Sequence, residues 1–137
     1  MAVVEELLRS ESDGSISFGN HQLAEKAKLE DFQFNGDVYK VKTFSAMTKL
    51  EKNGLFAYES VPGTSVSHFT EMEKGISFVV EGNQDAQITV GVEENAEYEV
   101  VIGNENVGTM NTNVSGKLNL SVELEGIGEI KVELFRK

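Results

Sequence analysis

The two histidines are the first side chains with which this sequence could do chemistry. His21 and His68 lie far apart in the chain, and because there is no cysteine, a structural zinc site would need both of them plus carboxylates. Their spacing does not indicate such a site, since His21 follows a Gly-Asn turn and His68 stands beside Phe69 in an expected strand. We expect structural roles for both histidines and no metal ligand among them.

Paired carboxylates are the second candidate. Glu5-Glu6, Glu93-Glu94 and the Glu71/Glu73 pair could supply the acid and the nucleophile of a glycoside hydrolase. With 23 acidic residues in 137, however, some pairing is unavoidable, and adjacent carboxylates in a turn point in different directions. No G-x-S-x-G elbow is present either. We expect no catalytic residue and no cofactor. Calcium is a weak alternative, because the acidic loops lack the D-x-D-x-D-G spacing of a calcium loop.

Aromatic side chains give the remaining hint of a binding site. Tyr58 and Phe69, with His68 beside them, are our candidate ligand-binding residues, because sugar-binding sandwiches expose aromatic platforms. The alternative is that these rings alternate into the core. The absence of Trp favours the core, since Trp is common in such platforms.

The elements that would position these residues are strands. Apolar and polar residues alternate over 88–92, 98–102, 118–124 and 130–134, which is typical of antiparallel strands with one buried face. Asn35-Gly36-Asp37 and Lys52-Asn53-Gly54 indicate tight hairpins, and Pro62-Gly63 indicates a type II turn. Residues 21–29 fit a strand or irregular structure. The sequence predicts an all-β fold, an antiparallel β-sandwich or jelly-roll-like assembly of about 10–12 short strands.

One domain over residues 1–137 is the expected organisation. A soft boundary near 81–84 is the alternative, since the part that follows could form a five-stranded hairpin array by itself. At the start, Val3, Val4, Leu7 and Leu8 fit a short amphipathic helix, an edge strand, or an arm on a neighbouring subunit. Phe135 is expected on the outer face of a terminal strand. These five residues are our candidate interface of a homo-oligomer.

The net charge of the sequence argues against two classes of partner. Twelve basic against 23 acidic residues give a net charge of −11, which repels phosphate backbones and anionic lipid, so we expect neither nucleic acid nor a membrane as partner. No basic, apolar leader opens the sequence and no run reaches the roughly 20 apolar residues of a transmembrane helix, so we expect a cytoplasmic protein.

Three stretches carry a resemblance to other proteins. Residues 39–44 (YKVKTF), 48–54 (TKLEKNG) and 58–64 (YESVPGT) resemble a group of short proteins of gut anaerobes among the Firmicutes, which often carry the label "endosialidase". The C-terminal part is similar to small sandwich modules of bacterial carbohydrate-active proteins. The label implies glycan hydrolysis. Endosialidases, however, resemble one another in a large propeller with an arginine cluster, and this chain has only Arg9 and Arg136.

The sequence thus leaves three functions open. The first is a non-enzymatic, self-associating interaction or structural module. The second is a carbohydrate-binding module, and the third is a small glycan hydrolase.

Overall fold

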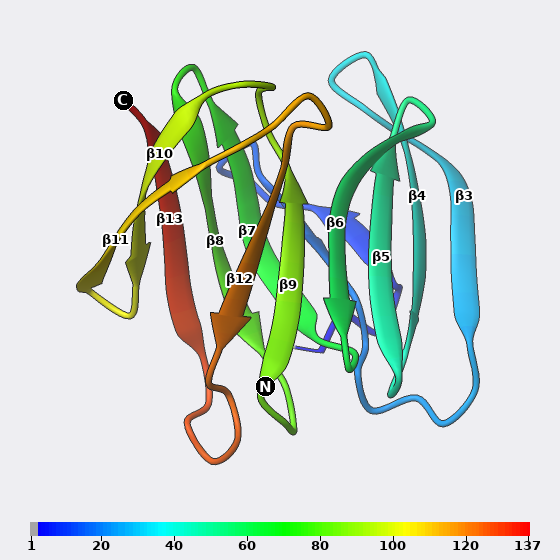
Figure 1. Ribbon diagram of the computed structural model, residues 1–137. Coiled ribbons are helices and arrows are strands. Elements are labelled where there is room, and N and C mark those ends of the chain that lie inside the picture. Colours follow the sequence, from blue (N-terminus) through cyan, green and yellow to red (C-terminus); the bar gives the residue numbers. More distant parts are fainter. Residues whose placement is uncertain (1–2) are drawn as a thin grey trace.

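The protein is a sandwich of two antiparallel sheets, and Figure 1 shows the strands of each sheet spread side by side. The computed structural model describes residues 3–137, which form thirteen strands and no helix. The all-β prediction is therefore confirmed, with one strand more than the upper bound expected. The strands are β1 (Leu8–Ser10), β2 (Ile16–Phe18), β3 (Ala27–Phe34), β4 (Asp37–Phe44), β5 (Met47–Lys52), β6 (Leu55–Val61), β7 (Ser65–Met72), β8 (Gly75–Glu81), β9 (Ala86–Gly91), β10 (Glu97–Ile102), β11 (Glu105–Asn111), β12 (Lys117–Val122) and β13 (Ile130–Arg136).

The two sheets have different topologies. One has seven strands in the order β1-β2-β7-β8-β13-β10-β11, and the other has six in the order β12-β9-β6-β5-β4-β3. In the six-stranded sheet β3 to β6 follow one another as a meander. Its turns at Asn35-Gly36 and Asn53-Gly54 have positive φ at both residues, as the two hairpin signals in the sequence predict.

The C-terminal strands do not form the predicted hairpin array. β9 pairs with β12 in one sheet, whereas β13 inserts between β8 and β10 in the other. The array, which was the reason for the alternative boundary near 81–84, was wrong because alternation reveals which face of a strand is buried but says nothing about its neighbour. Strands from both sides of residues 81–84 pair within each sheet, β6 with β9 and β8 with β13.

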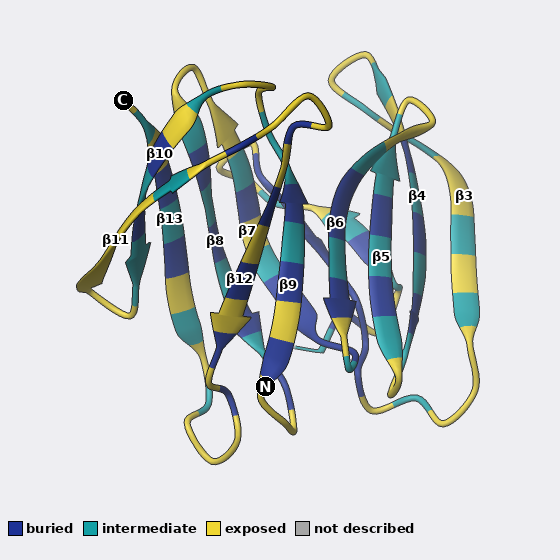
Figure 2. Ribbon diagram, viewed as in Figure 1, coloured by how far each residue is buried: buried dark blue, intermediate teal, exposed yellow. Residues whose placement is uncertain are grey.

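The core lies between the two sheets, and along many strands of both sheets buried residues alternate with half-buried or exposed ones (Figure 2). Its centre is a cluster of aromatic rings. Tyr58 lies edge-on to Phe18 at 5.2 Å and to Phe78 at 5.6 Å between centroids, and Phe69 stacks on Phe78 at 5.8 Å. Tyr58 therefore belongs to the core, as the alternative interpretation of the aromatic residues held.

The N-terminal segment is not helical: residues 5–7 form a turn and a bend, and β1 begins only at Leu8. β1 pairs with β2, and Val4 and Leu8 are 0% and 2% exposed because they pack into the core of their own chain. The amphipathic helix, one of the three alternatives for this segment, was therefore wrong, since the backbone N–H of Val4 donates to the Gly19 carbonyl and β1 pairs with β2. Val3 and Leu7 are half-buried. No helix of residues 3–137 has the length and apolar character to cross a lipid bilayer.

The turn at Pro62-Gly63 also differs from the prediction. The Val61–Pro62 peptide bond is cis, and Gly63 lacks the positive φ that a type II turn requires. Glycine is needed here for another reason: a Cβ atom at this position would lie 1.9 Å from the carbonyl oxygen of Phe44.

Candidate functional site

One end of the sandwich carries polar residues at positions that face inward. Along β5, Thr48 and Leu50 are buried between the sheets, and the next inward residue is Lys52. Lys52 lies opposite Tyr39 of β4, which is 7% exposed, and Glu71 of β7 lies opposite the buried Ile76. The period of two thus continues to the rim, but the residue type changes from apolar to charged.

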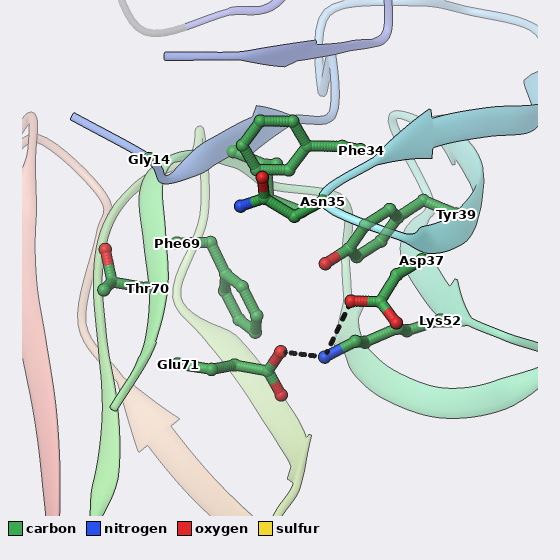
Figure 3. A pocket seen from close by; sticks show the side chains of 10 residues that line it. Gly14, Phe34, Asn35, Asp37, Tyr39, Lys52, Phe69, Thr70 and Glu71 are labelled. Carbon is green, nitrogen blue, oxygen red and sulfur yellow. Dashed lines mark hydrogen bonds and ion pairs between the residues drawn. The ribbon is translucent and has the colours of Figure 1, made fainter. Parts of the chain in front are cut away.

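These side chains surround a pocket of about 210 Å³ between the two sheets. In Figure 3 they converge on it from strands of both sheets, close to the turns at Asn35-Gly36 and Asn53-Gly54. The lining consists of Gly14, Ile16, Phe34, Asn35, Asp37, Tyr39, Lys52, Phe69, Thr70 and Glu71.

An ion-paired lysine organises the polar side of the pocket. The Lys52 Nζ atom lies 2.6 Å from Glu71 Oε1 and 3.6 Å from Asp37 Oδ2, so it joins the two sheets. Asn53 Nδ2 donates a hydrogen bond of 2.9 Å to Asp37 and holds that carboxylate in place. Burial alone would lower the pKa of Lys52, but the hydrogen bond and charge of Glu71 outweigh it, so the pKa lies above its usual value. Two carboxylates against one ammonium leave the pocket with a net charge of about −1.

Aromatic rings form the other side of the pocket. Phe34 is half-buried and Phe69 is 4% exposed, so each offers only part of its ring. The hydroxyl of Tyr39 points into the pocket (Figure 3), and no hydrogen bond holds it within residues 3–137. Burial raises the pKa of Tyr39, so this hydroxyl keeps its proton and can donate a hydrogen bond. The pocket combines apolar ring surface with several hydrogen-bonding groups.

The sequence-based site residues are not brought together here. Tyr58 is fully buried and its hydroxyl bonds to Thr64 Oγ1 at 2.8 Å, so it cannot serve as a surface platform; this part of the prediction was wrong. Phe69 lines the pocket but is 4% exposed. His68 is not among the residues that line the pocket.

His68 takes part in a polar cluster that resembles a catalytic triad without its geometry. Its Nδ1 atom lies 3.0 Å from Asp13 Oδ2 and 3.2 Å from Ser15 Oγ. Both partners share one ring nitrogen, whereas a triad uses the two nitrogens for the two partners. Ser15 is 1% exposed and its hydroxyl donates to Asp13 at 2.5 Å, which lowers the pKa of that carboxyl. This arrangement is a structural one that ties the loop before β2 to β7.

His21 is buried and takes part in another structural contact. It is 3% exposed, and its Nδ1 atom lies 2.7 Å from Ser65 Oγ. In the described part of the chain, no group of three or more His, Asp or Glu side chains is placed to hold a metal ion. The expectations about calcium and cofactors stay predictions.

Asp37, Tyr39 and Lys52 are pocket residues that we did not predict from the sequence, and we considered Glu71 only as a member of a carboxylate pair. The sequence did contain an indication for Lys52. It follows Thr48 and Leu50 at a spacing of two, so it takes an inward-facing position at which an apolar residue is expected. Asp37 and Glu71 could not be found this way, since only the folded chain brings the β3–β4 turn near β7.

The sequence and the structure were compared with known proteins, and no similar protein was found. Neither the models of protein families, nor the curated proteins, nor the solved structures include a match to this chain.

Proposed function

We propose that this protein is a non-enzymatic binding module that takes a neutral sugar ring into the Lys52 pocket, by which we mean the pocket between β4, β5 and β7. The observation that supports this most is the free Tyr39 hydroxyl beside the fixed carboxylates of Asp37 and Glu71. A sugar ring has C–H faces that pack on aromatic rings and hydroxyls that pair with such groups. This is the mixture that small-molecule sites present.

The size and charge of the pocket narrow the ligand class. Its volume of about 210 Å³ is below the roughly 300–1,000 Å³ of typical small-molecule sites, so a single ring suits it. Its charge of about −1 disfavours an acidic sugar. Arg9 pairs with Glu11 at 2.9 Å and Arg136 with Glu93 at 2.6 Å, so neither guanidinium is directed to this pocket for a sugar carboxylate.

Binding fits the geometry better than hydrolysis. A glycoside hydrolase places its two carboxyl groups on either side of the bond to be cleaved. Here the ammonium of Lys52 occupies the space between Asp37 and Glu71 and contacts both. The endosialidase activity implied by the resemblance also requires an anionic substrate, which the charge of this pocket disfavours.

The test is a titration of the protein with neutral sugars, in which binding is measured by isothermal titration calorimetry. The probes are glucose, galactose, mannose, xylose and N-acetylglucosamine, together with their β-1,4-linked dimers. We expect at least one of these sugars, with its dimer, to bind. The Tyr39→Phe variant should bind this sugar about two- to tenfold more weakly, because one hydrogen bond is lost while the ring remains. Lys52→Met should weaken binding further, since it frees both carboxylates to move.

The matched control is Lys40→Met, which changes the neighbouring residue of β4 on the outer face of the same sheet. It should bind as the unmodified protein does. Absence of binding across the whole panel, or equal affinity of the Tyr39 and Lys40 variants, would contradict the proposal. Circular dichroism of each variant establishes that a loss of binding is not a loss of fold.

A further inference from the structure

A second hollow lies beside the Lys52 pocket at the same end of the sandwich. It has a volume of about 370 Å³ and shares Glu71 with the first pocket. Its walls come from the β7–β8 turn, the start of β8, the link between β9 and β10, and the end of β13. Glu71 therefore marks the boundary between two neighbouring hollows rather than the edge of one.

The second hollow, like the first, is lined by a charged residue that continues the inward-facing series of a strand. Arg136 lies opposite Tyr98 in the pairing of β13 with β10, so it follows Val132 and Leu134 on the inward face. The inward series thus ends in a charged residue here too, as it does at Lys52 of β5. Arg136 is the counterpart of Lys52 in the second hollow.

Hydrogen bonds hold the walls of the second hollow in place. Arg136 Nη1 lies 2.6 Å from Glu93 Oε2, and the backbone N–H of Arg136 donates to the Lys74 carbonyl at 2.7 Å. The backbone N–H of Glu93 donates to the hydroxyl of Tyr98 at 3.0 Å, and Tyr98 is 3% exposed. The β7–β8 turn is therefore tied to β13, and the β9–β10 link is tied to both β10 and β13, so the hollow is preformed.

At the opposite end of the sandwich, the inward residues beside the start of β9 and the end of β12 are apolar. There the inward residues Val122 and Leu124 are 2% and 0% exposed, and Ala86 is 3% exposed. Asp85 accepts hydrogen bonds from the backbone N–H groups of Leu124 at 2.9 Å and of Glu125 at 3.1 Å, which closes the loop over the core. A hollow of about 370 Å³ lies at this end too, but the inward residues that line it, Ala86 and Val122, are apolar.

We infer that the two hollows form one groove, which takes a linear chain of at least two neutral sugar units with one unit in the Lys52 pocket. This inference rests on the function proposed above. With the shared Glu71 counted once, the groove carries Asp37, Glu71, Glu73 and Glu93 against Lys52, Lys74 and Arg136, a net charge of −1. This charge does not oppose a neutral chain, whereas it disfavours a polyanion.

The experiment is a chain-length series with three proteins. The probes are the monosaccharide that binds in the first test and its β-1,4-linked oligomers of two to six units, measured by calorimetry. For the unmodified protein we expect Kd to fall about tenfold or more between one and three units, and then to level off. Arg136→Gln should remove most of this gain and leave the affinity for the monosaccharide within about twofold.

The matched control is Lys131→Gln, a change of a cation on the outer face of the same strand, whose side chain is 54% exposed. It should keep the full gain with length. An affinity that does not depend on length, or a gain that survives Arg136→Gln, would overturn the groove while the single-ring site stands. If no sugar of the panel binds, the proposed function fails and the groove with it.

Discussion

At the scale of single residues, His21 is a buried titratable group that the proposed site does not use. Burial lowers its pKa, and the opposing effects of the Glu81 charge and the Asn83 hydrogen bond are smaller. In the unfolded chain a histidine titrates near pH 6.5. Above this pH His21 is neutral in both states and contributes no pH dependence.

We expect acid to destabilise the fold through this residue. As the pH falls below about 6.5, the unfolded chain binds a proton that the folded chain does not, so the free energy of unfolding decreases until the folded pKa is reached. Asp13 and Asp85 also have lowered pKa values, but carboxyl groups act below about pH 4.5. Urea unfolding at pH 5, 6, 7 and 8 measures the effect.

His21→Gln isolates the contribution of this one group. The variant should show a flatter dependence of stability on pH between 5 and 6.5 than the unmodified protein, whatever its stability at pH 8. Equal slopes for the two proteins would show that another group titrates in this range.

At the scale of elements, the close approach of Gly63 to β4 fixes the link between β6 and β7. A Cβ atom at Gly63 would lie 1.9 Å from the Phe44 carbonyl oxygen, whereas one at Gly36 would meet nothing within 4 Å. Gly63→Ala should therefore destabilise the protein by about 3 kcal/mol or more, because backbone must move. Gly36→Ala, strained only by its φ of +81°, should cost about 1–2 kcal/mol. Thermal unfolding compares the two, and equal losses would contradict this account.

The strands themselves were predictable from the sequence, but their partners were not. Alternation identified β9, β10, β12 and β13, and the two Asn-Gly pairs identified the turns of the meander, because both signals are local. The placement of β9 and β12 in one sheet, and of β10 and β13 in the other, depends on contacts between segments that are distant in the sequence. The groove was hidden for the same reason, since Lys52, Glu71 and Arg136 belong to three strands that only the fold unites.

At the scale of the whole molecule, self-association is still a prediction of the sequence. Two of its supporting residues, Val4 and Leu8, are buried within their own chain, whereas Phe135 is 37% exposed on the outer face of β13. Deletion of residues 1–8 should therefore act on stability: we expect a lower Tm, because it removes Val4 and Leu8 from the core.

Light scattering over a concentration series separates this effect from assembly. A truncated protein that melts earlier but keeps the mass of the full chain would agree with the buried position of the segment. A multimer that dissociates on truncation without a loss of Tm would show that the segment holds subunits together. Phe135→Ser, which leaves the core intact, is the matching change for an interface on the outer face.

The position of β13 also has a consequence for how the chain reaches its fold. During synthesis β8 and β10 are complete well before β13, which must lie between them. Until residues 130–136 emerge, both strands keep an unpaired edge, and such edges invite pairing with other chains. The meander β3–β6 has no such delay, since each of its strands meets its partner within a few residues. The nascent protein therefore passes through a stage in which all strands of the six-stranded sheet have been made while the seven-stranded sheet still lacks one of its interior strands.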